Sequence, residues 1–489
     1  MTLERPRGRA ASMLFVGILI ALMAACVALW AALRVDDSLF VDAKAFYCAG
    51  QALDAGRDPY LNASLSACEN GLHTLHLRDW PGSQNIVVPV PFPPLALAPF
   101  ALLALLPFGA AIVLWTGLNI VAAAWGAELL RRTLPSLTAP FVGVAVVVSV
   151  LPAGIRLGQP SGIVFLAIVA AGLALRGGAR AGLFGWPAVA VLQPHVAVPL
   201  FAALLVAPLR TARWAVVAVV GALLALSVLL AGRLSLEYVL RVLPAHAGAN
   251  LVDSSQLALP SALAAAGVVP HAALAIGDAT YAAVVVIGLI VAVRIAELSA
   301  RPEALAWIAT MFGTIAAPHL HTQQLCCALP GALLLCALGT APVLTRIATY
   351  GVAIPWVTLL TFTWGPGFAL ATALGAWRRP SPRRLIALAG LGGGLCALLI
   401  GLALVLTHLD HPLHPIAVAK PPAQALAEVT WAIGIAVDSA AFRTATLPAR
   451  AMTWAAELAL LVVALAAARL LPQHSKDAVG LHGTSVPIG

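Results

Sequence analysis

Long apolar runs separated by short polar segments make up most of the chain. The runs are about as long as a membrane-crossing helix, and they lack the alternation of apolar and polar residues typical of a barrel strand. Because hydrocarbon offers the backbone no hydrogen-bond partners, we expect each run to be helical. The pattern predicts ten to fourteen spans, and ten of them rest on clear runs. The clear runs lie at about 13–33, 109–130, 139–153, 161–175, 214–230, 272–295, 304–317, 322–338, 385–406 and 453–470.

Two further apolar stretches are harder to read as single spans. Between Arg180 and Arg210 two runs of about a dozen residues are split by Gln193-Pro194-His195, so neither half is a comfortable crossing. A pair of short or broken helices is expected there. The stretch 347–377 is expected to form a hairpin that turns near Trp364.

Composition agrees with a multi-pass membrane protein. Of the 489 residues, 61% are hydrophobic and only 10% are charged, which no soluble fold could accommodate. The net charge of +9 is spread over short basic clusters between apolar runs, so it indicates topology rather than a nucleic-acid partner. Placing the clusters in the cytoplasm puts both termini inside and leaves three outer loops, at about 34–91, 233–271 and 408–450. We expect one domain over 1–471, with short interfacial helices in the outer loops, and a disordered cytoplasmic tail over 472–489.

The cysteines do not form an obvious framework. Cys48 and Cys68 both fall in the first outer loop, where an oxidising compartment would permit a disulfide. The other five lie in apolar runs, where packing explains them, and the odd total argues against a set of paired cysteines.

Asp42 is the first candidate for chemistry. If a helix covers 42–55, Phe46, Ala49 and Leu53 form an apolar stripe with Asp42 at its N-terminal end. Asp42 could be the N-cap of this helix, a catalytic carboxylate, or both. Its neighbours Asp36 and Asp37 fit a membrane boundary, and Asp58 fits a turn before Pro59.

Histidines of the later chain offer a second set of candidates. His319 and His321 follow an apolar run and could bind a ligand or mark a helix start after Pro318. A His-x-His pair can bind metal, but no third ligand stands nearby, so we expect no metal site. The sequence has no Asp-x-Asp, P-loop or dinucleotide-binding glycine motif to hold a nucleotide sugar.

Four blocks, in order along residues 36–325, together resemble glycosyltransferase family 87. Its best-known members are polyprenyl-phosphate-mannose-dependent α-1,2-mannosyltransferases. The blocks are Phe92-Pro93-Pro94, Gly158-Gln159, Ala317-Pro318-His319 and a first-loop pattern of Asp42, Phe46, Tyr47, Ala49, Gly56, Pro59 and Tyr60.

The resemblance implies a helical bundle of the GT-C type in a bacterial-type inner membrane. It further implies inverting transfer of a hexose or pentose, mannose foremost, from a polyprenyl-phosphate donor to a lipid or glycan acceptor on the outer face. The donor is a co-substrate, and no cofactor is expected. Asp42 would be the general base. The expected substrate-binding residues are Tyr60, Arg156, Gln159, Gln193, His195, His319 and His321.

Histidines 319 and 321 and Arg156 would supply a cation near the departing phosphate. Gln193 departs from the family, many members of which have lysine before this proline, and the change removes an expected phosphate partner.

Two other functions fit a chain of this kind. A transporter or flippase of a lipid-linked intermediate should show internal repeats and ionisable residues near mid-span, and no clear repeat is visible. A non-catalytic family member would be compatible with the missing lysine. The transferase hypothesis requires Asp42, His319 and the Gly158-Gln159 turn to meet at one outward-facing cavity.

Overall fold

The structure is a computed structural model that describes residues 40–72, 82–150, 157–353, 405, 408–409, 418–440 and 443–471. Within these ranges the regular structure is helical, apart from one isolated antiparallel bridge between Leu61 and Leu426. The all-α prediction is therefore confirmed. The first predicted span, the turn near Trp364, almost all of the run at 385–406 and the tail from 472 lie outside the described residues.

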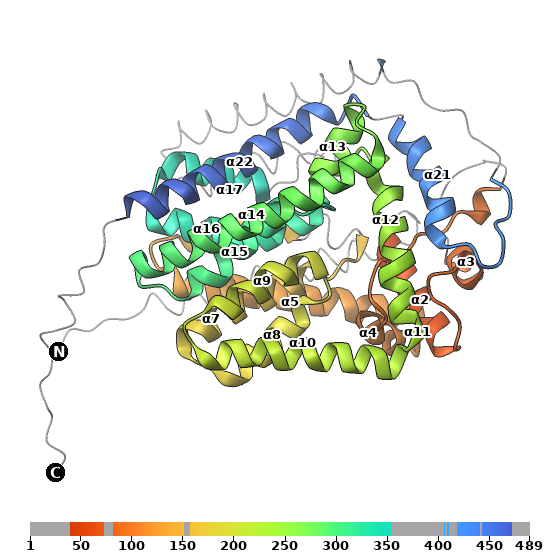
Figure 1. Ribbon diagram of the computed structural model, residues 1–489, viewed down its shortest axis with the longest axis horizontal. Coiled ribbons are helices and arrows are strands. Elements are labelled where there is room, and N and C mark those ends of the chain that lie inside the picture. The colour runs from red at the N-terminus through yellow and green to blue at the C-terminus, as the bar shows by residue number, and fades with distance from the viewer. Residues whose placement is uncertain are drawn as a thin grey trace, which may run out of the picture.

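Four of the described helices are long and apolar enough to cross a membrane. Much of their surface faces outward, as expected of helices in lipid, and Leu229 of the second is 79% exposed. These helices are α5 (Phe108–Thr133), α10 (Arg210–Ala231), α14 (Pro270–Ser299) and α22 (Leu447–Leu470). They run along the long axis of the molecule, and together with the helical content they establish a polytopic membrane protein (Figure 1).

Shorter helices fill the space between the long ones. They are α6 (Ala139–Val150), α7 (Ser161–Gly177), α8 (Arg180–Ala190), α9 (Pro194–Val206), α15 (Glu303–Ile315), α16 (Leu329–Leu338) and α17 (Pro342–Ala353). Helices α8 and α9 are the expected broken pair. Proline is suited to the first turn of a helix, and it forces the preceding residue into an extended conformation, as seen for Gln193 (φ −131°, ψ 88°).

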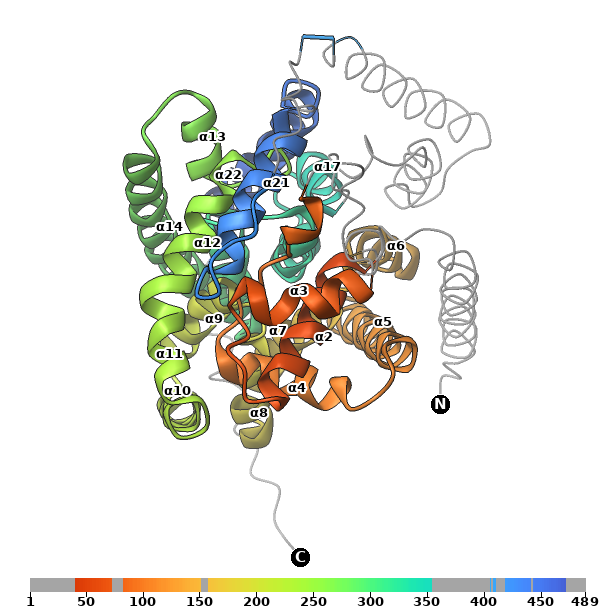
Figure 2. The same cartoon turned by 90° about the vertical axis from the view of Figure 1, so that its right-hand side faces the viewer.

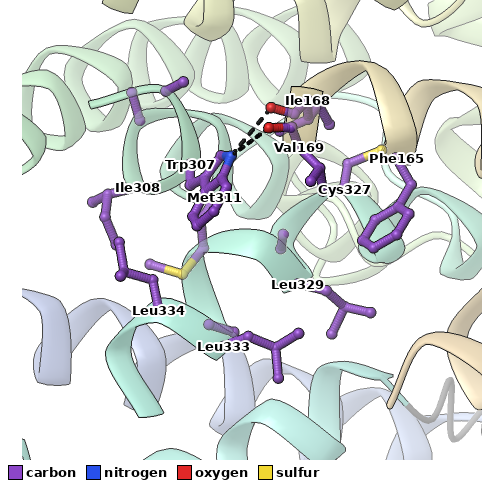
Figure 3. Packing of buried hydrophobic residues seen from close by; sticks show 14 of the residues in the cluster. Phe165, Ile168, Val169, Trp307, Ile308, Met311, Cys327, Leu329, Leu333 and Leu334 are labelled. Carbon is purple, nitrogen blue, oxygen red and sulfur yellow. Dashed lines mark hydrogen bonds between the residues drawn. The ribbon is translucent and has the colours of Figure 1, made fainter. Parts of the chain in front are cut away.

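The core lies where α7, α15 and α16 meet. Trp307 of α15 is fully buried, and its indole N–H lies 3.2 Å from the Ile168 carbonyl oxygen and 3.3 Å from that of Val169 (Figure 3). Gly172 of α7 lies so close to this indole that any side chain there would collide with it. These contacts hold α7 and α15 together. The chain just before α7 and just after α15 supplies Gln159 and His319.

The remaining helices gather at one end of the molecule, on the right in Figure 1 and facing the viewer in Figure 2. All of them belong to the three predicted outer loops or adjoin them. They are α2 (Val41–Asp54), α3 (Asn62–Gly71), α4 (Pro94–Ala104), α11 (Arg233–Glu237), a π-helix (Tyr238–Val242), α12 (Leu243–Ala249), the 3₁₀ helix η4 (Asn250–Val252), α13 (Leu259–Ala265) and α21 (Ala427–Ala440).

The first and third outer loops are joined directly. The Asn62 N–H donates to the Ala425 carbonyl oxygen at 3.0 Å, and the Ala427 N–H donates to that of Tyr60 at 2.9 Å. Within the first loop, a disulfide between Cys48 and Cys68 ties α2 to α3. The bridge that the sequence permitted is thus formed, and it fixes the helix that carries Asp42.

Candidate functional site

A cavity of about 1030 Å³ lies among the helices at this end of the molecule. Its wall combines side chains from all three outer loops with the turn that follows α15. The lining residues used below are Asp42, Gln159, Gln193, His195, Val198, Tyr238, Leu243, His246, Asn250, Asp253, Ser255, Leu274, His319, His321, Gln323, Trp431, Ile435, Asp438 and Ser439. Asp42, His319 and Gln159 therefore line one cavity, which is part of what the transferase hypothesis requires.

Asp42 lies in the first turn of α2, with its carboxylate at the cavity. Helix α2 begins at Val41, and its N-cap is Phe40, which adopts a left-handed conformation (φ 59°). The N-cap interpretation of Asp42 is therefore wrong. Its Oδ2 instead accepts a hydrogen bond of 2.6 Å from Nε2 of Gln159, which comes from a distant part of the chain.

Gly158 brings Gln159 to this position. Its backbone has a positive φ of 77°, and a Cβ at this position would collide with that of Ala43 on α2. Only glycine allows both the conformation and the close approach. The indole N–H of Trp115 on α5 donates to the Gly158 carbonyl oxygen at 2.6 Å and fixes the turn.

The surroundings of Asp42 favour proton acceptance near neutral pH. Burial raises the pKa of its carboxyl to about 6, against a smaller lowering by the Gln159 hydrogen bond. Such a carboxyl is ionised above pH 6 and is a stronger base than an exposed aspartate. This combination suits a general base that works at neutral pH.

Three imidazoles form one cluster in the cavity wall. The ring centroids of His246 and His319 are 5.0 Å apart, and those of His319 and His321 are 4.7 Å apart. Burial lowers the pKa of His246 to about 3 and that of His319 well below its usual range. It also lowers the pKa of His321, although the carboxylate of Asp253 opposes the shift. Burial thus favours the neutral imidazoles, which argues against the expectation that His319 and His321 supply a cation.

His321 also begins a helix, as the sequence allowed. It is the N-cap of the 3₁₀ helix η5 (Thr322–Ala328), and its backbone N–H donates to Oε1 of Gln324 at 2.9 Å. The helix that follows Pro318 therefore starts as 3₁₀ and continues into α16.

Gln193 and His195 line the cavity at the break between α8 and α9. Gln193 is 2% exposed, and its Oε1 accepts a hydrogen bond from the thiol of Cys327 at 3.4 Å. Within the described ranges, Nε2 of Gln193 and Nε2 of His195 are buried and have no hydrogen-bond partner. Buried polar atoms without a partner are costly, so these two are candidates for ligand contacts.

Two of the expected site residues do not contribute to the described wall. Tyr60 is buried beneath the first loop, and its hydroxyl donates to the Phe92 carbonyl oxygen at 2.7 Å. It is absent from the cavity lining, so its contacts support the loop rather than a ligand. Arg156 lies outside the described residues.

None of the residues expected at the site came from the second or third outer loop. The cavity draws His246, Asn250 and Asp253 from that loop, and it draws Trp431 and Asp438 from α21. The available signal was their concentration in loops on one face. Across the described part of the chain, no three or more His, Cys, Asp or Glu side chains are arranged to hold a metal ion.

Comparison with known proteins supports the resemblance seen in the sequence. Neither the curated proteins nor the solved structures gave a match. A family model, glycosyltransferase family 87, does match residues 91–318, which include Gln159, Gln193, the second outer loop and Pro318. The match confirms the resemblance over this part of the chain, which is similar to glycosyltransferase family 87, a family of membrane glycosyltransferases.

Proposed function

We propose that the chain transfers a hexose or pentose, with mannose the first sugar to test, from a polyprenyl-phosphate donor to a lipid or glycan acceptor. The reaction inverts the anomeric carbon and takes place on the outer face of a bacterial-type inner membrane. The observation that carries the proposal is Asp42, whose carboxylate lines the cavity with its pKa raised to about 6.

In the proposed reaction Asp42 accepts the proton of the acceptor hydroxyl. The hydroxyl oxygen forms a bond to the anomeric carbon while the bond from that carbon to the phosphate oxygen breaks. Polyprenyl phosphate leaves as an anion, and the proton on Asp42 is lost to solvent afterwards. The amide of Gln159 holds Oδ2, which leaves Oδ1 for the acceptor.

Neutral hydrogen-bond donors would hold the departing phosphate. The unpartnered Nε2 of Gln193 can donate where a lysine was expected, although it brings no charge. His319 offers a further ring nitrogen to the same cavity. Donors fixed before the reaction stabilise a developing anion without reorganising during it.

The donor's prenyl chain would lie against an apolar part of the wall. Val198 of α9 and Leu243 of α12 line the cavity, yet they are 50% and 46% exposed. Leu274 of α14 also lines the cavity. An apolar wall that reaches the outer surface would let a lipid enter sideways while its phosphate reaches the polar interior.

The acceptor would lie against α21. Trp431, Ile435 and Asp438 follow each other at i, i+4 and i+7 on one face of this helix and line the cavity, as does Ser439. An aromatic ring next to carboxylate and hydroxyl groups suits a ligand with an apolar face and many hydroxyls, as a sugar has.

A donor panel tests the proposal. Purified protein in lipid vesicles is incubated with labelled polyprenyl-phosphate sugars, with nucleotide sugars and with a mixed lipid and glycan acceptor extract. We expect transfer from at least one polyprenyl-phosphate sugar and none from nucleotide sugars, and the Asp42→Asn variant should be inactive. Movement of intact donor across the vesicle without cleavage would instead identify a flippase.

A further inference from the structure

A buried glutamine joins two of the cavity histidines. Gln256 is 1% exposed, and its Nε2 lies 2.9 Å from Nδ1 of His319 and 2.9 Å from Nε2 of His321. Its Oε1 accepts a hydrogen bond of 3.1 Å from the Leu320 N–H. The Leu257 N–H donates to the Leu320 carbonyl oxygen at 2.8 Å, so the backbone holds the amide in place.

These contacts fix which end of the amide faces the histidines. A flipped amide would turn its NH₂ group toward the N–H of Leu320, leaving two donors facing each other in a buried site. The NH₂ group of Gln256 must therefore face both rings. Because an amide NH₂ only donates, Nδ1 of His319 and Nε2 of His321 must each be an acceptor that carries no proton.

The remaining ring nitrogens of this pair then carry the protons. Nε2 of His319 is an N–H donor in a residue that lines the cavity. Nδ1 of His321 lies 3.4 Å from Oγ of Ser255 and 3.9 Å from Oδ2 of Asp253, and both oxygens can accept.

The third histidine repeats the pattern with a different amide. Nδ2 of Asn250 donates to the His246 carbonyl oxygen at 2.8 Å and lies 3.1 Å from Nε2 of the same residue. The carbonyl contact fixes the amide's orientation, so Nε2 of His246 is also an unprotonated acceptor. Its Nδ1 then carries the proton; this atom is buried and lies 3.8 Å from Oε1 of Glu428, with no hydrogen-bond partner among the described residues.

Protonating any of these rings would set a new N–H against an amide N–H. The charged and titratable groups around the cluster are Asp253, Asp438 and Glu428, His195 on α9, and Arg450, which interacts with Asp253. Asp253 alone favours a charge on His321, and burial outweighs it. Burial lowers the pKa of all three imidazoles in the same direction.

We infer that Gln256 and Asn250 are positioning residues that hold three neutral histidines in fixed tautomers, so that His319 meets its ligand as an uncharged Nε2–H donor. The statement that His319 donates to the donor's phosphate rests on the proposed function. The tautomers of the three histidines do not depend on it. The site would then stabilise its leaving group by directed hydrogen bonds rather than by an imidazolium charge.

The first test reads the ring nitrogens of the whole protein by ¹⁵N NMR, with single His→Gln variants to assign the signals. We expect His319 to keep one protonated nitrogen, Nε2, and one unprotonated nitrogen from pH 5.5 to pH 8. A doubly protonated His319 at pH 6.5, or a proton on Nδ1, would overturn the inference. The experiment measures no transfer, so its outcome does not depend on whether the proposed function is right.

The second test replaces the amide of Gln256, which donates hydrogen bonds to both rings, by a carboxylate, which accepts them. Gln256→Glu places a carboxylate between His319 and His321, which favours protonation of the rings, so at least one of them should gain a second protonated nitrogen at neutral pH. Gln323→Glu adds the same charge to the cavity wall at a residue that no described hydrogen bond joins to these rings, and it should leave their tautomers unchanged. Unchanged rings in Gln256→Glu, or equal changes in both variants, would contradict a positioning role.

The pH profile of sugar transfer gives the third readout. If a histidine cation of ordinary pKa were needed, the rate would fall about tenfold for each pH unit above 6.5. Neutral donors predict no such fall between pH 6.5 and pH 8 in the wild-type protein. The Gln256→Glu variant should acquire a falling limb in this range, which a merely structural role would not produce.

Discussion

Replacing Asp42 by asparagine removes the carboxylate and keeps its shape. The asparagine oxygen can still accept the hydrogen bond from Gln159 that the aspartate accepts at 2.6 Å. Helix α2 should also keep its start, since Phe40 is its N-cap. We therefore expect Asp42→Asn to fold and to be extracted from the membrane in normal amounts.

The stability of this variant follows from the raised pKa. A rise from 3.8 to about 6 means that the ionised carboxylate costs the folded state about 3 kcal/mol relative to the unfolded state. Because the folded pKa is raised, the stability is fully present below pH 4 and declines as the pH rises through 6. Asp42→Asn should avoid this loss, gaining at most about 3 kcal/mol above pH 6 and nothing near pH 4.

The transfer rate of Asp42→Asn should fall, although its stability above pH 6 should rise. A positioned general base contributes about 10²- to 10⁴-fold to a rate, so the single-turnover rate of sugar transfer should fall by at least about 100-fold. Thermal unfolding at pH 4.5 and pH 7.5, together with the transfer rate, measures both effects. Undiminished transfer, or a lower melting temperature at pH 7.5, would refute this account of Asp42.

Asp58→Asn provides the matched control. Asp58 lies in the same loop, and its Oδ1 accepts a hydrogen bond from the Tyr60 N–H at 2.9 Å. It does not line the cavity, so this variant should keep its transfer activity.

Three further predictions concern the support of this carboxylate. Gln159→Leu removes the hydrogen bond that lowers the pKa of Asp42, so the acid limb of the pH–rate profile should move above pH 6; an unmoved limb would contradict the pairing. Gly158→Ala forces a side chain into a positive-φ turn against α2, and both the melting temperature and the transfer rate should fall, whereas a neutral result would show that the turn can relax. Replacing Cys48 and Cys68 by serine opens a loop with a separation of 20 residues and should cost about 3 kcal/mol in thermal unfolding; an unchanged melting temperature in non-reducing buffer would argue against the disulfide.

The architecture was largely predictable because apolar runs determine where helices can cross a membrane. The break between α8 and α9 was predictable for a local reason, since Pro194 can start a helix but cannot continue one. Asp42 could be singled out only because the loop pattern around it resembles glycosyltransferase family 87. Its capping role could not be decided, because the left-handed conformation of Phe40 starts the helix two residues earlier.

The rest of the site depends on contacts between distant parts of the chain. The role of Gln256 follows from its hydrogen bonds to Leu320 and two histidines more than sixty residues away, which no local pattern encodes. Tyr60, by contrast, was expected at the site but does not line the cavity. Its residue type suits a sugar, but a hydrogen bond to Phe92 buries it within the loop.

The central claim is that the Asp42 cavity transfers a sugar from a polyprenyl phosphate with inversion. The most direct measurement is the anomeric configuration of the product formed by purified protein from a labelled polyprenyl-phosphate sugar of known configuration. The account predicts a glycoside of the opposite configuration, formed at a rate that rises with pH through about 6, as the pKa of Asp42 requires. A product that retains the donor's configuration would contradict it.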